Sequence, residues 1–237
     1  MSTQKDQNKL DETKLDEICL KYYLNRDKSH GVNHIYKVLK NIDEILKHFV
    51  FSHREMIILR TCALLHDAYD HKYFETAKDV ISIKEKISND LYEFGMSWNE
   101  IQIIFIIIDN ISFSKEKKQR IQKKYRYSEL LSLLSTKMIN IRNIVSDADK
   151  IEALGTEGIS RMILYSIHKN QGITVAEIMD DIKQLCENKL YILLSHDYIR
   201  TETGRKIATQ KLKELKEITE NHEILRTFIE NFLKHDN

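Results

Sequence analysis

The chain has 237 residues, 42% of them hydrophobic, which is enough apolar material for one large domain. Its 37 lysines and arginines nearly cancel its 36 aspartates and glutamates, and this balance argues against a dedicated nucleic-acid-binding protein, which usually carries a strong basic excess. The most apolar run, residues 101–108, is far shorter than the roughly 20 residues that a membrane-spanning helix needs.

The N-terminal residues and the cysteines indicate the compartment. Residues 1–10 are polar and charged, so they are predicted to be a disordered tail and not a secretory signal. The three cysteines, Cys19, Cys62 and Cys186, are too far apart for a zinc-ligand spacing or a disulfide framework. We therefore expect a soluble, cytoplasmic protein.

Apolar residues recur at helical spacing along the chain, and no segment shows the sustained alternation that is typical of strands. Four helix starts are marked by a Ser or Thr that is followed three residues later by an acidic residue: Ser52/Glu55, Thr76/Asp79, Ser97/Glu100 and Thr174/Glu177. In chain order, helices are predicted at about residues 14–24, 34–49, 53–65, 77–94, 101–111, 138–154, 175–194 and 203–233.

Glycine and proline usage supports an all-helical chain. There is no proline, and the six glycines lie at or near breaks in the helical pattern. No Gly-rich phosphate loop and no Gly/Ser-rich linker are present. We predict a single all-α domain over residues 11–237, after the disordered tail. The strongly basic segment 114–127 is predicted to be a solvated surface.

The segment from Leu64 to Tyr73 carries the densest group of ionisable residues after an apolar helix. Two histidines, two aspartates and a lysine fall within the seven residues from His66 to Lys72. Burying adjacent ionisable groups is costly unless a metal ion or a specific partner offsets their desolvation. The plainer alternative is a polar helix end, where His and Asp are common.

Further candidate ligands lie elsewhere in the chain. His34 falls in the first turn of the second predicted helix, and an aspartate near residue 149 follows an apolar stripe. Two imidazoles and two carboxylates suit a divalent ion of the manganese, iron or cobalt type better than calcium. Asp147 and Asp149 lie about equally far to either side of the stripe, about 200° apart, so periodicity does not choose between them.

His34, His66-Asp67 and Asp149 resemble the H…HD…D signature of the HD-domain superfamily of metal-dependent phosphohydrolases, which are all-α helical bundles. In that superfamily the last ligand lies in an Ala-Asp-basic-hydrophobic segment, and Ala148-Asp149-Lys150-Ile151 matches it. The resemblance therefore favours Asp149. The chain is also similar to the bacterial branch of YpgQ- and YedJ-like proteins, through residues 29–34, 66–73, 110–113, 147–155, 158–161, 188–190 and 201–208.

The resemblance implies a nucleotide pyrophosphohydrolase that cleaves nucleoside triphosphates or related nucleotides with metal-activated water. It implies His34, His66, Asp67 and Asp149 as ligands of a divalent ion, Mn²⁺ first, with Mg²⁺, Co²⁺, Fe²⁺ or Ni²⁺ as alternatives. The open alternatives are a cyclic-nucleotide phosphodiesterase or nucleotidase with the same ligands, and a non-catalytic module that senses a nucleotide or metal. The expected partner is a small phosphorylated molecule. Two chains could also pair through exposed apolar positions of the last helix.

The predicted catalytic residues are Asp67, Asp70, His71 and Lys72. Lys72 would neutralise a phosphate and His71 would move a proton, whereas the plainer alternatives are a solvated lysine and a capping histidine. Lys72, Arg161 and Lys189 are the candidates for contact with the substrate. For Arg161 and Lys189 a structural ion pair explains the sequence equally well.

Overall fold

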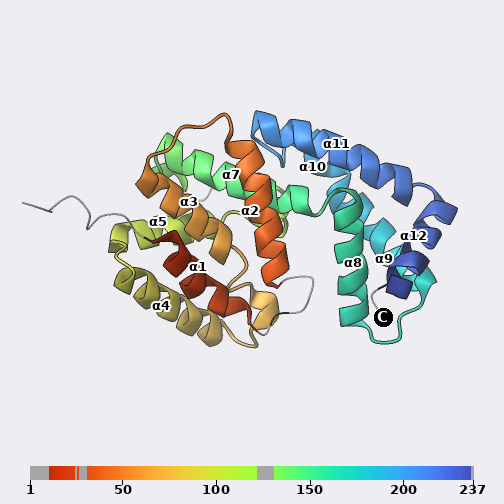
Figure 1. Ribbon diagram of the computed structural model, residues 1–237, viewed down its shortest axis with the longest axis horizontal. Coiled ribbons are helices and arrows are strands. Elements are labelled where there is room, and N and C mark those ends of the chain that lie inside the picture. The colour runs from red at the N-terminus through yellow and green to blue at the C-terminus, as the bar shows by residue number, and fades with distance from the viewer. Residues whose placement is uncertain (1–10, 25, 27–30, 122–130, 236–237) are drawn as a thin grey trace, which may run out of the picture. The chain divides into compact units, whose positions relative to one another are not determined.

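The computed structural model describes residues 11–24, 26, 31–121 and 131–235. Every regular element within these ranges is helical, which confirms the predicted all-α class (Figure 1). The predicted tail 1–10 and the end of the basic segment, residues 122–127, lie outside the described residues. The chain divides into two compact units, residues 1–24 with 50–142 and residues 25–49 with 143–237. The prediction of one domain over 11–237 stays a prediction.

In the first unit α3 (His53–Leu65) is surrounded by apolar neighbours. It packs against α1 (Glu12–Leu20) and α5 (Trp98–Ile108), and α4 (Ala77–Glu93) packs against α1 and α5. The residues of α3 are buried on most sides: Ile57, Ile58, Leu59, Thr61, Cys62, Ala63, Leu64 and Leu65. The buried run ends at Leu65, directly before His66 and Asp67. The remaining elements of this unit are η1 (Lys21–Tyr23), η2 (His71–Tyr73), α6 (Phe113–Ile121), η3 (Leu131–Leu133) and the first turns of α7 (Thr136–Glu152).

In the second unit α8 (Gly155–Lys169) packs against α11 (Glu202–Thr219) and α9 (Val175–Leu185). The last helix, α12 (His222–His235), lies against α9, α11 and α8, and α2 (Val32–Leu46) contacts α11 (Figure 1). Between α9 and α11 come the π-helical turn η4 (Cys186–Leu190) and the short α10 (Ile192–Ser195).

The four predicted capping pairs are all present, at the starts of α3, α4, α5 and α9. Each is a reciprocal pair of hydrogen bonds within four residues, so local sequence suffices to predict it.

The prediction of one helix over 203–233 was wrong. The chain breaks after Thr219, and the Asn221 side chain accepts hydrogen bonds from Glu223 N and Ile224 N at the start of α12. The helices α6 and α8 were not predicted.

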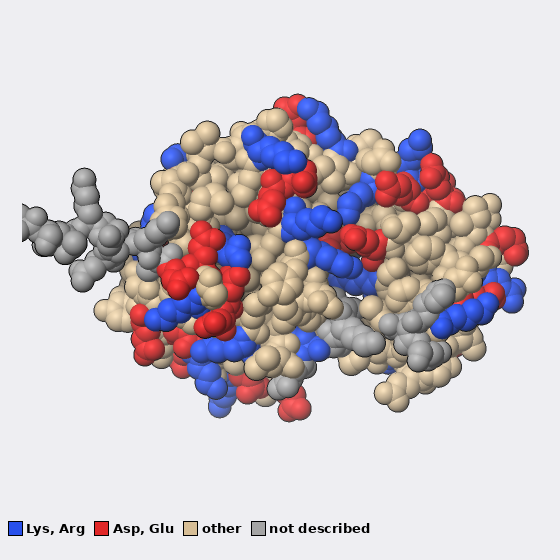
Figure 2. Space-filling view, in the orientation of Figure 1, with Lys and Arg blue, Asp and Glu red and all other residues tan. Residues whose placement is uncertain are grey.

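The described part of the basic segment is helical and partly engaged in ion pairs. In α6 the carboxylate of Glu116 pairs with Arg120 at 2.6 Å and with Arg142 of α7 at 3.5 Å, while Lys115 and Lys118 are exposed. On the face shown in Figure 2, Lys and Arg alternate with Asp and Glu in small groups.

Within the described ranges, no helix combines the length and apolar character that crossing a membrane requires. The cytoplasmic location and the homodimer stay predictions.

Glu100 links two helices of the first unit and gives this unit a predictable response to acid. It completes the capping box of α5 and accepts a hydrogen bond from Arg54 of α3 at 2.6 Å. These interactions, chiefly the one with Arg54, lower the pKa of Glu100 from 4.5 to about 2. Because the pKa is lower in the folded protein, the stabilisation is present above about pH 4.5 and is lost as the pH falls towards 2.

We therefore expect Glu100→Gln to lower the Tm near neutral pH, with the difference from wild type shrinking as the pH falls from about 4.5 to about 2. Thermal denaturation followed by circular dichroism over this pH range measures the effect. The exposed Glu93, replaced by Gln, serves as the control and should show no difference at any pH. A constant difference down to pH 2 for Glu100→Gln would contradict the prediction.

Candidate metal centre

His34 lies in the first turn of α2 and is buried in the second unit, where 2% of its surface is exposed. Asn41 follows it by two helical turns on the same face of α2, and its side-chain amide donates to the Ala148 carbonyl of α7 at 3.0 Å. This hydrogen bond fixes the position of α2 along α7. The His34 ring is thereby held beside the residue that follows Ala148, which is Asp149.

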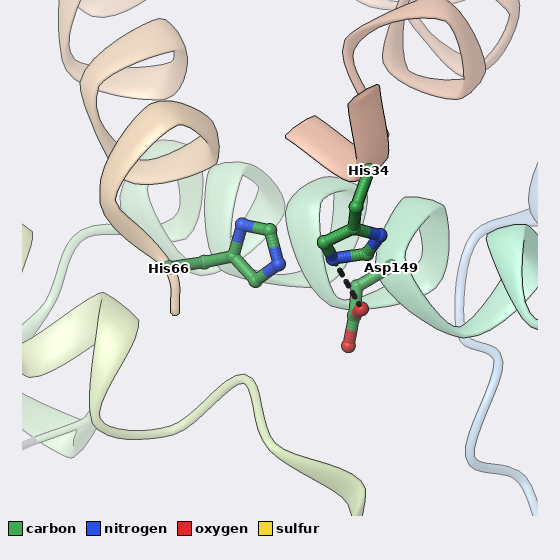
Figure 3. Close-up of side chains that lie close together, drawn as sticks. All are labelled: His34, His66 and Asp149. Atoms are coloured by element: carbon green, nitrogen blue, oxygen red, sulfur yellow. Dashed lines mark ion pairs between the residues drawn. The ribbon is translucent and has the colours of Figure 1, made fainter. Parts of the chain in front are cut away.

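The imidazole of His34 faces the carboxylate of Asp149. His34 Nε2 lies 3.6 Å from Asp149 Oδ1, a distance that Figure 3 marks with a dashed line and that is too long for a good hydrogen bond. Two ligand atoms that each lie about 2.1 Å from one ion are roughly 3 Å apart at right angles and roughly 4 Å apart on opposite sides. The pair therefore has the spacing of two metal ligands. The Asp149 side chain is 22% exposed, so small molecules can reach it.

The other nitrogen of His34 faces a second carboxylate. His34 Nδ1 lies 3.3 Å from Glu152 Oε2, and Arg161 Nη1 of α8 donates to the same oxygen at 2.5 Å. Burial alone would raise the pKa of Glu152, but the adjacent His34 ring and the charge of Arg161 outweigh it and lower the pKa to about 2. Glu152 is therefore an ionised carboxylate in the interior of the second unit.

In the first unit His66 follows the last residue of α3, and its side chain is 1% exposed. His66 Nδ1 lies 2.7 Å from the Ala63 carbonyl, which can only accept, so Nδ1 carries the hydrogen. In the neutral ring the lone pair is then on Nε2, which lies 3.7 Å from Asp67 Oδ2. The Asp67 backbone N–H donates to the hydroxyl of Tyr23, which holds the start of this loop.

The two histidines share one arrangement, each within its own unit. In both rings Nδ1 faces an oxygen acceptor, while Nε2 faces a carboxylate at 3.6 or 3.7 Å. An acceptor at one ring nitrogen fixes the tautomer and leaves the other nitrogen as a ligand, as is usual for metal-binding histidines. Figure 3 shows both rings with Asp149. His34, His66 and Asp149 are therefore a group of side chains that could hold a metal ion.

The residues after Asp67 form a tight turn that leads into η2. Asp70 Oδ1 accepts a hydrogen bond from Lys72 N at 3.1 Å, and Asp70 Oδ2 lies 3.3 Å from Lys72 Nζ. The Lys72 side chain is 52% exposed, so this ion pair contributes little stability and leaves the ammonium accessible. His71 is the first residue of η2.

The other two predicted substrate contacts have different surroundings. Arg161 is engaged with Glu152, and only 17% of its side chain is exposed. Lys189 is half-buried in η4. Short π-helical turns are rare and are often found at functional sites. Arg161 thus contacts the Glu152 carboxylate that also faces His34. Lys189 lies on an irregular turn of the second unit.

Asp147 lies on α7 two residues before Asp149 and is completely buried. Its carboxylate accepts hydrogen bonds from Arg200 N at 3.0 Å, Thr201 N at 2.6 Å and Thr201 Oγ1 at 2.7 Å, which fix the start of α11. The side chain of Asp147 therefore has a structural task within the second unit.

The sequence analysis did not single out Glu152 or the burial of Lys150. Lys150 is 1% exposed, and its ammonium donates to Ser146 Oγ. The spacing of Glu152 was informative, since it follows Asp149 by three residues and thus lies on the same side of a helix. Nothing in the spacing of Lys150 indicates that it is buried.

Comparison with known proteins supports this description of the fold. No family model matches the chain. Bacillus subtilis YpgQ is 25% identical over 158 residues, a match that spans 66% of each chain, just under two thirds of the relative's length. The chain is homologous to YpgQ. A crystal structure of a Lactobacillus plantarum protein has a TM-score of 0.65 at 20% identity and covers 96% of this chain and 99% of that one. The structure of Bacillus subtilis YpgQ in complex with ADP has a TM-score of 0.57 at 21% identity, with 86% and 92% covered.

Proposed function

We propose that the chain is a metal-dependent phosphohydrolase of the HD superfamily that acts on nucleoside triphosphates or related nucleotides. The observation that carries the proposal is the shared arrangement of His34 and His66, in which each Nε2 is left as a ligand beside a carboxylate. One ion would be held by His34, His66, Asp67 and Asp149, the ligand set that the resemblance to the superfamily implies. His34, His66 and Asp149 each offer one ligand atom to such an ion.

A divalent ion at these residues would supply a Lewis acid that lowers the pKa of water and polarises a phosphoryl oxygen. The protein's own groups would do the rest of the work. The accessible ammonium of Lys72 is suited to neutralise a phosphate, and His71 beside it is suited to move a proton. Lys189 is a further candidate for contact with the substrate.

A nucleotide is the substrate class that the relatives favour. The ADP in the YpgQ complex supports nucleotide binding by a protein of the same fold. The test is product identification with a panel of nucleoside triphosphates, cyclic nucleotides and monophosphates in the presence of Mn²⁺. Release of pyrophosphate or phosphate from triphosphates is the expected result. Turnover of cyclic nucleotides alone would favour a phosphodiesterase, and metal-dependent binding without turnover would favour a sensing module.

Activity is expected to depend on a transition ion. Because the ligand set combines imidazole with carboxylate, chelation should abolish turnover, and Mn²⁺ or Co²⁺ should restore it better than Ca²⁺. The measurement is the rate of phosphate or pyrophosphate release after dialysis against a chelator, with the residual metal content of the protein determined in parallel. Full activity in protein that has been shown to be free of metal would overturn the proposed function.

A further inference from the structure

Glu152 is the last residue of α7 and follows Asp149 by almost one helical turn, so both carboxylates point to the same side of the helix. They contact opposite edges of one imidazole, Asp149 at Nε2 and Glu152 at Nδ1. Their surroundings differ, because the side chain of Asp149 is 22% exposed and that of Glu152 is 1% exposed. Asp149 can therefore meet an ion and a substrate, whereas Glu152 meets only protein groups.

A buried carboxylate needs compensation, because moving it out of water costs several kcal/mol. Glu152 receives it from Arg161, whose guanidinium lies 2.5 Å from the oxygen that also faces His34. Arg161 Nη1 and His34 Nδ1 thus both lie close to one atom, Glu152 Oε2. An arginine committed in this way has a role inside the protein, which is a different role from the predicted contact with a phosphate.

The turn between α7 and α8 fixes where Arg161 can reach. Only Ala153 and Leu154 separate the two helices, and Gly155 adopts a φ of +72°, which favours glycine. At Gly158 a Cβ atom would lie 2.2 Å from the Ala153 carbonyl oxygen, so only glycine allows α8 to approach this closely. The turn therefore holds the first turn of α8 against the end of α7 and brings Arg161 to Glu152.

We propose that Glu152 and Arg161 are a buried positioning pair for His34, which keeps the hydrogen of its imidazole on Nδ1 and presents Nε2 beside Asp149. The inference rests on the proposed metal site, because it explains how His34 is kept ready as a ligand. Without an acceptor at Nδ1 the ring can place its hydrogen on Nε2 or rotate, and in either case the nitrogen that faces Asp149 no longer offers a lone pair. Arg161 acts through Glu152 and does not contact the substrate.

The test compares two variants that differ in whether an acceptor is kept. In Glu152→Gln the amide oxygen can occupy the position of Oε2 and accept from both donors. The double variant Glu152→Met/Arg161→Met removes the acceptor without leaving a buried unpaired charge, and apolar replacement of a whole buried ion pair is often well tolerated. The control is Glu157→Gln on α8, whose side chain is 53% exposed and lies 3.6 Å from Lys211.

Two measurements are made on each purified protein without any nucleotide. Titration calorimetry with Mn²⁺ gives the metal affinity, and ¹⁵N NMR of the histidine rings in metal-free protein near pH 8 gives the tautomer of His34, assigned with His34→Gln. We expect the Mn²⁺ affinity of the double variant to fall by about 10- to 100-fold, the loss that is typical when a group supporting a metal-binding histidine is removed. We also expect His34 in the double variant to lose the Nδ1–H tautomer. Glu152→Gln and the control should stay within a few-fold of wild type and keep the tautomer.

The outcomes separate the inference from the proposed function. If wild type binds Mn²⁺ and the double variant binds it equally well with the same tautomer, the positioning role is overturned and the metal site stands. If wild type binds no Mn²⁺, the proposed function fails, and the NMR comparison alone then tests the positioning role. A loss in Glu152→Gln as large as in the double variant would also overturn the inference, since it would show that the charge matters and not the acceptor.

Discussion

Asp149→Ala is expected to abolish binding of the divalent ion, whereas Asp147→Ala should retain it. Asp149 faces His34 Nε2 at 3.6 Å, so its loss removes a ligand, and the affinity should fall by more than the roughly 10- to 100-fold that is typical of a supporting group. Each variant removes one carboxylate from α7, so general electrostatic effects are matched. Metal analysis of the purified proteins and calorimetric titration with Mn²⁺ provide the comparison.

The two variants should also differ in stability, in the opposite order. Asp147→Ala leaves three donors of Arg200 and Thr201 without their buried acceptor, which should cost about 2–4 kcal/mol of the free energy of unfolding. Asp149 is partly exposed, so its removal should change the stability of the metal-free protein by less than about 1 kcal/mol. Urea denaturation measures both. If Asp147→Ala lost the ion while Asp149→Ala kept it, the choice of Asp149 as the ligand would be wrong.

Lys72→Ala is expected to keep the fold and the metal but to lower kcat/KM by about 30- to 1000-fold, the equivalent of roughly 2–4 kcal/mol for a charge-assisted phosphate contact. The ammonium is accessible and weakly held by Asp70, so it can turn to a substrate. The loss should grow with the number of phosphates on the substrate. Lys78→Ala, an exposed lysine of the same unit, is the control. Unchanged kcat/KM in Lys72→Ala would make Lys72 a solvated lysine and would direct attention to Lys189.

His71→Ala should lower kcat/KM by a factor of about 10²–10⁴ if His71 moves a proton. Unlike the loss at Lys72, this one should change the shape of the pH–rate profile, because a titrating group has been removed. Steady-state rates between about pH 5 and 9 show the difference, with the Lys72→Ala profile as the comparison. A profile of unchanged shape would leave His71 with a capping role.

The sequence by itself determined the features that depend on neighbouring residues. The all-α class follows from helical periodicity without strand-like alternation, and four helix starts follow from capping pairs that close within four residues. The position of His66 directly after a buried helix is equally local. The break between α11 and α12 was missed, because one Asn and no glycine or proline mark it. The absence of a strong breaker lets two helices resemble one in the sequence.

Only the tertiary structure decided what each polar residue of α7 contacts. A helical wheel places Asp147 and Asp149 symmetrically about the buried stripe, and the difference arises because α2 lies on the side of Asp149 and the start of α11 on the side of Asp147. In the same way, the pairing of Arg161 with Glu152 depends on the tight turn between α7 and α8. The ligand and supporting roles of these side chains are thus set by which helices pack against α7, which the periodicity of α7 alone does not contain.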